Sequence, residues 1–213
     1  MDHVTTLSLD SYFMNRQPLS VLPMEALDVS SMNDEQLAAA AQSGTQLAFT
    51  ELANRYWDKL NSYVRRLQPG TSEAEDIVQD ALLKAYTNLR SFNTERRFSP
   101  WIYRITHNAF VDHVKSRARD PLPFFDPEVL FPHPVATDNP AVEADIGSIR
   151  RLLDAHLNDL DRRYREPLIL RYYEDLSYKD IGDILRIPVG TVSIRIKRGL
   201  AKLRLTIPRD VTV

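Results

Sequence analysis

The sequence has 213 residues and a mass of 24.5 kDa, enough for one large domain or two small ones. Its 43% hydrophobic and 26% charged residues can build a packed core, which excludes a wholly disordered chain. The absence of cysteine excludes disulfides and thiolate chemistry, and no apolar run is long enough to span a membrane. No signal peptide is visible at the N-terminus, so we expect a cytoplasmic protein.

The formal net charge of −2 hides two strongly basic segments. Residues 90–119 hold seven basic and two acidic side chains, and residues 177–205 hold the same numbers, so each segment carries +5. Residues 1–89 and 120–176 each hold six basic and twelve acidic side chains, a net −6. Two basic segments in an acidic chain indicate two separate anion-binding surfaces, and the acidic segments should discourage indiscriminate DNA binding.

The first half of the sequence predicts an irregular start followed by helices. Residues 1–32 show no sustained period and contain two prolines, which favours a flexible extension over a short docking motif anchored by Tyr12 and Phe13. We expect a capping box at Ser72–Glu75, and an N-cap at Ser99 with Pro100 in the first helical position. No segment alternates at period two for long, so the expected fold class is all-α. The four helical segments predicted in this half are 33–44, 47–68, 72–89 and 99–119.

A proline-rich stretch separates the two halves of the chain. Six of the thirteen prolines lie in residues 120–141, which indicates a semi-extended linker and a domain boundary. Helical patterns resume at about 142–157 and 161–173. Pro167 falls inside the second pattern, either in the first turn of that helix or at a kink. Residues 208–213 are expected to form a short tail.

Residues 176–204 have the pattern of two short helices joined by a tight turn. Ser177 can cap the first helix. Pro188 and Gly190 interrupt the helical period, and Thr191 can cap the second helix. Such a helix-turn-helix can place its second helix in the major groove of DNA, although a solvated charged helix packed on a neighbour fits the same pattern. The residues predicted on the outer faces of the second helix are Ser193, Arg195, Lys197, Arg198 and Lys202.

Three stretches together resemble one family, the extracytoplasmic-function (ECF) sigma factors of bacterial RNA polymerase. Ala74–Tyr86 and Arg90–Arg119 are similar to region 2 of that family, and Leu160–Arg204 is similar to region 4. The resemblance implies two small helical domains joined by the proline-rich linker. Region 2 would cover residues 33–119 and region 4 residues 142–207.

The resemblance also implies three sets of binding residues. The family binds the largest subunit of core polymerase through one helical face, which here would hold Asp76, Gln79, Asp80 and Leu83. It melts and reads the minus-ten element where aromatic and cationic side chains can stack bases and hold the backbone. The residues implied there are Phe92, Asn93, Arg97, Phe98, Trp101, Arg104, His107, Asn108 and Lys115. Those implied at the minus-thirty-five element are Arg171, Tyr178, Thr191, Ser193, Ile194, Arg195, Lys197 and Arg198.

A few positions within these sets carry most of the interpretation. Asn93 is the best candidate to read a flipped base, because its amide both donates and accepts hydrogen bonds. Trp101 fits a core position equally well. Arg186 stands where the family usually has a turn glycine, and Ser193 and Ile194 stand where a basic residue and a serine are usual. These departures concern the DNA sequence that is read, and the implied role is unchanged.

The implied function is that of a dissociable initiation factor that binds core RNA polymerase and promoter DNA and is restrained by an anti-sigma factor. Neither a cofactor nor a metal is expected, because His107 and His113, the nearest of the five histidines, lie on different faces of one helix. A conventional helix-turn-helix regulator would explain residues 160–205 but not Ala74–Arg119. A recombinase or nuclease would need a carboxylate cluster with a metal or an activated nucleophile, so we expect no enzyme.

Overall fold

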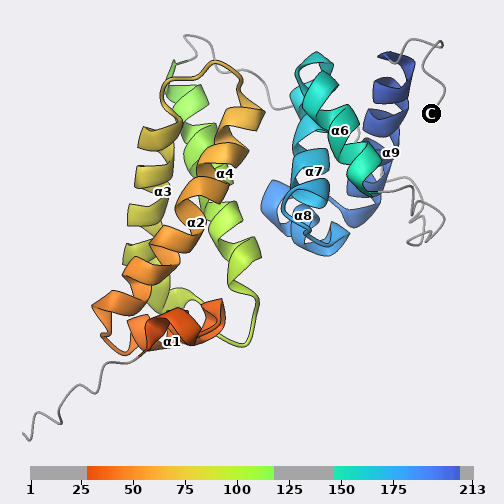
Figure 1. Ribbon diagram of the computed structural model, residues 1–213. Coiled ribbons are helices and arrows are strands. Elements are labelled where there is room, and N and C mark those ends of the chain that lie inside the picture. Colours follow the sequence, from red (N-terminus) through yellow and green to blue (C-terminus); the bar gives the residue numbers. More distant parts are fainter. Residues whose placement is uncertain (1–27, 118–145, 207–213) are drawn as a thin grey trace, which may run out of the picture.

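The described part of the chain is built from helices. The computed structural model describes residues 28–117 and 146–206, and every regular element within these two ranges is helical. The helices form an N-terminal bundle, α1 to α4, and a C-terminal bundle, α6 to α9 (Figure 1). The predicted all-α class with two helical domains is confirmed. Residues 1–27, 118–145 and 207–213, which include most of the predicted extension, the linker and the tail, lie outside the described residues.

The N-terminal bundle packs its helices around an aliphatic and aromatic core. Its helices are α1 (Asp34–Gln42), α2 (Gln46–Leu67), α3 (Ala74–Asn88) and α4 (Phe98–Arg117). Two short 3-10 helices accompany them, η2 (Val29–Ser31) and η3 (Leu89–Ser91). Apolar residues three and four apart turn one face of each helix inward. The fully buried core includes Leu37, Leu52, Leu60, Tyr63, Val64, Val78, Ile102, Tyr103 and Phe110.

The η2 turn lies inside the stretch 1–32 that was predicted to be a flexible extension. Arg55 of α2 holds this turn by donating to the carbonyl oxygens of Met32 at 2.7 Å and Ser30 at 2.9 Å. The same guanidinium pairs with Asp34, the first residue of α1, at 3.1 Å. One arginine therefore satisfies several backbone acceptors at once, and η2 belongs to the N-terminal bundle.

Local sequence signals set the ends of α1 and α2 as predicted. Asn33 caps α1, since its Oδ1 accepts the N–H of Gln36 at 2.8 Å while Gln36 Oε1 accepts the N–H of Asn33 at 3.0 Å. Gly44 and Gly70 follow α1 and α2 with φ of 102° and 77°, which cost glycine little. Both helices end where the sequence has these glycines.

The predicted capping box at Ser72–Glu75 is wrong. α3 begins at Ala74, and Glu73 occupies its N-cap position without a side-chain capping bond. The Glu73 carboxylate is paired instead with His113 and Arg117 near the end of α4. A tertiary ion pair has therefore taken the place of local capping at this helix start.

The predicted start of α4 is also wrong. The helix begins at Phe98, so Ser99 lies inside it and Pro100 is its third residue instead of its first. The backbone N–H of Phe98, which has no partner within the helix, donates to Glu35 Oε1 of α1 at 2.9 Å, so a distant side chain serves the start of this helix. Pro100 still lies in the first turn, where its missing N–H costs no intrahelical hydrogen bond.

The C-terminal bundle packs its last helix against the three before it. Its elements are α6 (Ile146–His156), η5 (Leu157–Asp159), α7 (Arg162–Tyr172), α8 (Tyr178–Leu185) and α9 (Val189–Thr206). Gly199 lets α9 approach α7 closely, because a Cβ there would lie 2.7 Å from Leu168 Cδ1. Pro167 lies past the first turn of α7, which rules out the first-turn alternative.

The turn between α8 and α9 follows the predicted helix-turn-helix. Ser177 caps α8 by accepting the N–H of Asp180 at 3.1 Å, as predicted. Arg186 ends α8 with φ of 55° and ψ of 45°, the left-handed conformation that a turn glycine adopts more cheaply. The turn is tight, since a Cβ on Gly182 would lie 2.9 Å from the carbonyl oxygen of Ile187. A nonglycine residue at 186 thus keeps the turn at some cost in strain.

The predicted N-cap at Thr191 is wrong. α9 begins at Val189, and the N–H of Val192 already donates to the carbonyl oxygen of Pro188 at 3.1 Å. Thr191 therefore lies inside the helix, where it is buried. The helix starts directly after Pro188 because its helical hydrogen bonding begins at the carbonyl of that residue.

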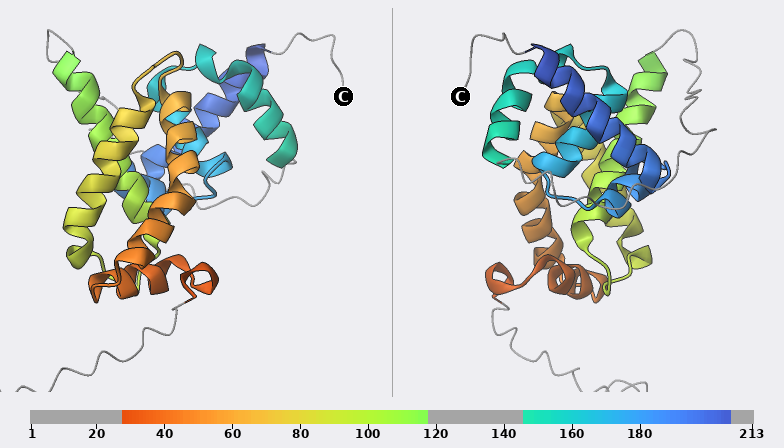
Figure 2. Two further views of the ribbon diagram at one scale, coloured as in Figure 1. Left: turned by 60° about the vertical axis from the view of Figure 1, so that its left-hand side comes forward. Right: turned by 90° about the vertical axis from the view of Figure 1, so that its right-hand side faces the viewer.

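The two bundles lie against each other. α8 packs beside α4, and α7 packs beside α2 (Figure 2). Buried apolar residues of both bundles form one contact network. Among the described residues, none of the helices is long and apolar enough to cross a bilayer.

Candidate nucleic-acid and polymerase interfaces

An aromatic cluster underlies the implied minus-ten surface. The rings of Phe92, Phe98 and Trp101 lie with centroids 5.1 to 5.5 Å apart, at the junction between η3 and α4. Phe92 and Phe98 are buried in the core, whereas Trp101 is half-buried. The core alternative for Trp101 therefore holds in part, because its ring packs on Phe92 and Phe98 while part of it stays accessible.

Polar and cationic side chains stand around this cluster. Asn93, Arg97 and Arg104 are exposed, and Asn93 Oδ1 accepts the N–H of Glu95 at 2.9 Å. The loop is thereby tied in an Asx turn. Cations beside a partly accessible aromatic ring suit a single nucleic-acid strand, since the cations attract phosphates and the ring can stack a base.

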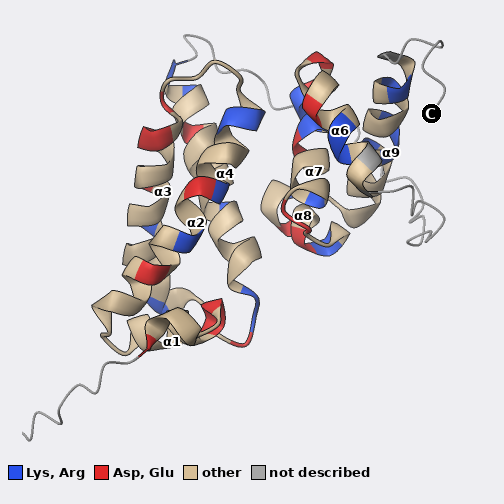
Figure 3. Cartoon of the chain, viewed as in Figure 1, with Lys and Arg blue, Asp and Glu red and all other residues tan. Residues whose placement is uncertain are grey.

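A cleft of about 600 Å³ separates this surface from α8. On one side it is lined by the residues just described, and on the other by Asp180 and Asp183 of α8. Arg97 Nη1 lies 3.7 Å from Asp180 Oδ2. Figure 3 shows basic and acidic residues of α8 beside the N-terminal bundle. The implied minus-ten residues thus face the other half of the same chain.

The remaining residues implied for the minus-ten element lie farther along α4. His107 Nδ1 lies 2.6 Å from Glu166 Oε1 of α7, so this histidine is part of the contact between the bundles. Asn108 is half-buried and Lys115 is exposed. The structure therefore spreads the implied residues along α4 and brings together only those of its first turns and the preceding loop.

Glu166 is the most deeply buried carboxylate at this contact and was not predicted as functional. Burial raises the pKa of its carboxyl, but His107, Arg162 and Tyr63 outweigh that effect and lower the pKa to about 2. Tyr63 donates its hydroxyl to Glu166 Oε1 at 2.6 Å, and burial holds the pKa of that hydroxyl well above its usual value. No signal in the sequence marks Glu166, because its partners come from distant helices.

The residues implied for the minus-thirty-five element divide into exposed and buried groups. Lys197 and Arg198 are exposed, and Ile194 is half-buried. Ser193 and Arg195 are only 5% and 7% exposed, so the prediction that both lie on outer faces is wrong for this arrangement. α9 contacts three helices of its bundle instead of one, and more of its circumference is covered than a two-helix pattern predicts.

Arg171 and Tyr178 lie side by side at the base of the helix-turn-helix. The Arg171 guanidinium is 5.8 Å from the centre of the Tyr178 ring, and its Nη1 donates to the carbonyl oxygen of Leu176 at 3.2 Å. Both side chains are half-buried. They can present a cation and a hydroxyl next to α9, as backbone contacts require.

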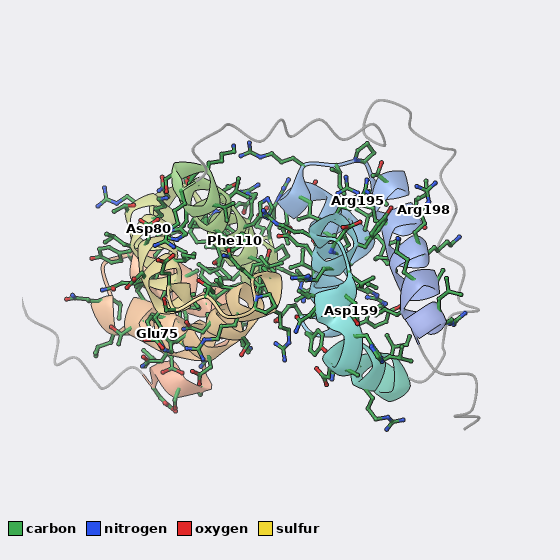
Figure 4. The ribbon with its side chains drawn as sticks, turned by 90° about the horizontal axis from the view of Figure 1, so that it is seen from above. Glu75, Asp80, Phe110, Asp159, Arg195 and Arg198 are labelled. Carbon is green, nitrogen blue, oxygen red and sulfur yellow. The ribbon has the colours of Figure 1, made fainter. Side chains whose placement is uncertain are left out.

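The implied polymerase-binding residues form an exposed strip on α3. Asp76, Gln79, Asp80 and Leu83 are all exposed, Leu83 by 62%. Asp80 pairs with Lys84 at 2.9 Å and raises the pKa of that ammonium group. Figure 4 shows Asp80 on the side of the N-terminal bundle away from the C-terminal bundle.

Sequence reasoning missed an apolar extension of this strip. Tyr86 is 51% exposed, and its ring lies edge-on to Phe49 with centroids 4.9 Å apart. Leu47 of α2 is 58% exposed. Exposed apolar side chains next to carboxylates are typical of a protein-binding surface. Helical periodicity aligns Leu47 and Tyr86 with core residues of their helices, and it cannot tell an inner stripe from an outer one.

Comparisons with known proteins show the family of this chain. Residues 52–120 match the family Sigma-70 region 2, and residues 150–203 match Sigma-70, region 4. The chain is 35% identical over 171 residues to the ECF RNA polymerase sigma factor SigW of Bacillus subtilis, covering 76% of this chain and 90% of that protein. The chain belongs to the ECF sigma factors. The RNA polymerase sigma-H factor of Pseudomonas aeruginosa is 33% identical over 174 residues, covering 78% of this chain and 89% of that protein.

A solved structure has the same fold over most of the sigma factor. CnrH, determined in complex with the cytosolic domain of CnrY, matches with a TM-score of 0.59 and 28% identity, covering 84% of this chain and 99% of that chain. The protein is thus a sigma factor that directs promoter-specific initiation by RNA polymerase. Sigma factors are not a class of enzymes, and the described residues hold no cluster of potential metal ligands.

Proposed function

We propose that the N-terminal bundle binds core polymerase through α3 and captures the minus-ten strand beside α4, while α9 reads the minus-thirty-five element. This proposal rests mainly on the exposed side chains of Asn93, Arg97 and Arg104, which surround the half-buried ring of Trp101. This group combines attraction for phosphates, a stacking surface and one amide that can read a base edge. The exposed acidic strip on α3 supplies a separate surface for a protein partner.

At the minus-thirty-five element the exposed cations Lys197 and Arg198 are the first candidates for contact. A guanidinium can fork onto a guanine, a contact worth about 1–3 kcal/mol of discrimination. The half-buried Ile194 would touch a thymine methyl. Ser193 and Arg195 are buried, so they can contact DNA only after the parts of the protein that cover them move away.

An anti-sigma protein is the natural regulator of such a factor. CnrH was solved with the cytosolic domain of CnrY. The sigma factor RpoE of Bartonella quintana, solved with the anti-sigma factor NepR, matches with a TM-score of 0.56 and 26% identity, covering 76% of this chain and 98% of that chain. The exposed Leu47, Leu83 and Tyr86 offer such a partner an apolar surface. The factor would act in the cytoplasm and without catalytic activity of its own.

Replacement of Asn93 tests the assignment of base capture. Asn93→Ala should reduce promoter opening more than closed binding, as measured by permanganate reactivity of unpaired thymines and by gel shift with reconstituted holoenzyme. Asn93→Ser is the matched variant, because a serine can keep the turn bond to the N–H of Glu95 but lacks the amide. Both variants should lose opening. Loss with Ala alone would assign Asn93 to loop structure, and equal loss of opening and closed binding would argue against base capture.

A further inference from the structure

The turn between α8 and α9 has an arginine at a strained backbone position. Arg186 has φ of 55°, and within the described ranges the only other nonglycine residue with positive φ is Asp175. Aspartate adopts this conformation more readily than arginine, because its short polar side chain can form a local hydrogen bond. Glycine adopts it at no steric cost. The backbone of the turn therefore does not favour arginine at position 186.

The contacts of the turn fix this left-handed conformation. The backbone N–H groups of Arg186 and Ile187 both donate to the carbonyl oxygen of Gly182, the second of them at 3.1 Å. Such bonds to a left-handed residue are a common way to end a helix. α9 begins at Val189, only three residues after Arg186. The turn is too short for Arg186 to leave the left-handed region, so the strain stays in the native structure.

The Arg186 side chain makes no internal contact that would explain an arginine at this position. It is exposed, and none of the described residues accepts a hydrogen bond from its guanidinium or pairs with it. Asp183, three residues earlier in α8, is exposed as well and forms no ion pair with it. A strained position that carries a side chain without an internal partner points to a partner outside the chain.

Arg186 is also the exposed cation nearest to the start of α9. In residues 185–196, all of which are described, the cationic residues are Arg186 and Arg195, and Arg195 is only 7% exposed. The exposed cations Lys197 and Arg198 come more than two helical turns after the start of α9. A recognition helix contacts base edges through its N-terminal residues, while the helix before it crosses the DNA backbone. The turn that joins the two helices therefore lies near phosphates.

We propose that Arg186 binds a backbone phosphate at the edge of the minus-thirty-five groove and thereby holds the first turns of α9 at the bases. A guanidinium suits this task, because it can donate two parallel hydrogen bonds to a phosphate. The contact adds affinity and fixes the register of α9, but it reads no base. The inference rests on the proposed reading of this element by α9. The strain at position 186 is then a loss of stability that accompanies a gain in DNA binding.

Three replacements separate the charge of Arg186 from its backbone conformation. Arg186→Gly removes both the cation and the left-handed strain, so it should raise the midpoint of urea unfolding while it weakens promoter binding. Arg186→Asn also removes the cation but keeps a side chain that tolerates the left-handed conformation, and it should weaken binding to the same extent. Arg186→Lys keeps the strain and a positive charge that can bind phosphate, and it should retain most of the binding.

Binding is measured with the full chain in reconstituted holoenzyme, on a labelled duplex that this holoenzyme has selected from a pool of random sequences. One phosphate contact fewer lowers the slope of log affinity against log salt by about 0.9. The deficit of Arg186→Gly should therefore be about threefold larger at 50 mM than at 200 mM salt. The ratio of affinities for the selected duplex and for one with a scrambled minus-thirty-five element should stay unchanged, because a phosphate contact does not distinguish bases.

Asp175→Gly is the matched control, because it places a glycine at the other left-handed position without removing a cation. It should leave promoter binding no weaker. Arg198→Ala reports on the proposed function itself and should weaken binding to the selected duplex.

The outcomes separate the two proposals. If Arg198→Ala weakens binding and Arg186→Gly does not, the phosphate contact of Arg186 is wrong while the reading by α9 stands. If neither weakens it, the placement of α9 at this element fails and the contact of Arg186 fails with it. Binding kept by Arg186→Asn but lost by Arg186→Gly would assign Arg186 to the shape of the turn and overturn the proposal, as would equal losses in Arg186→Lys and Arg186→Asn.

Discussion

The N-terminal bundle has two faces that differ in what covers them. On α3, Asp80 and Leu83 are open to solvent, and on the opposite side α4 lies under α8. Figure 4 places Asp80 away from the C-terminal bundle, whose Arg195 and Arg198 lie on the far helix α9. The surface proposed for polymerase therefore lies away from the C-terminal bundle, whereas the surface proposed for the minus-ten strand lies beside a cleft that α8 also lines.

The two faces should differ in how they respond to substitution. A substitution at the buried contact between the bundles removes a partner that water cannot replace, whereas a substitution on α3 changes groups that are already solvated. We therefore expect the larger effects at the buried contact.

The largest effect is expected from Glu166→Gln. The pKa of this carboxyl falls from an ordinary 4.5 to about 2, so its ionisation stabilises the native state above pH 4.5, and the contribution is lost as the pH falls through 2. A shift of that size corresponds to about 3 kcal/mol of the free energy of unfolding at neutral pH. The variant should lose much of this contribution and show a flatter dependence of stability on pH between 4.5 and 2, measured by urea unfolding with circular dichroism.

Glu75→Gln provides the matched control on the open side of the bundle. Glu75 is an exposed residue of α3 whose carboxylate pairs with Arg65, and both side chains are more than half exposed. Its replacement should leave the pH dependence close to that of the unaltered protein. Equal flattening by both substitutions would show that Glu166 is not a special contributor.

A somewhat smaller effect is expected from Asp80→Arg on the open face. Reversal of an exposed charge within a protein interface should weaken binding to core polymerase by about 2 kcal/mol, with unchanged thermal unfolding. Competition against a labelled sigma factor for core enzyme would measure it. Asp159→Arg reverses an acidic residue of the C-terminal bundle that is similarly exposed, and should leave core binding unaltered. If Asp80→Arg competes as well as the unaltered chain, α3 is not the polymerase surface.

Much of the fold could be predicted from the sequence because its signals are local. Helical period placed the ends of α1 and α2 close to the glycines at 44 and 70, and Ser177 placed the start of α8. The predicted starts of α3 and α4 failed where distant residues supplied the partners. Glu73 pairs with α4, and the N–H of Phe98 is satisfied from α1. A pattern of neighbours cannot report a bond across the bundle.

For the candidate binding sites, the sequence could predict the types of residue involved but not which of them are exposed. Asn93 and Arg97 are exposed as their polarity predicts, but Arg195 is buried although its charge predicts the opposite. Glu166 illustrates the limit most clearly. It lies in a strongly charged stretch whose composition is typical of a solvated surface. Its partner Tyr63 lies 103 residues away in the sequence. Only the packing of the two bundles brings that pair together.

The smallest effect is expected from Arg65→Ala, which tests how little an exposed ion pair contributes compared with the buried contact of Glu166. Arg65 Nη2 and Glu75 Oε1 lie 2.9 Å apart, as close as many buried pairs, but the side chains are 59% and 64% exposed. Water solvates both ions before and after the pair forms, so its net contribution should be about 0.5 kcal/mol or less. Urea unfolding at low and at high salt would measure it, and any small loss should vanish at high salt. A loss as large as that of Glu166→Gln would mean that distance, and not burial, decides the strength of ion pairs in this protein.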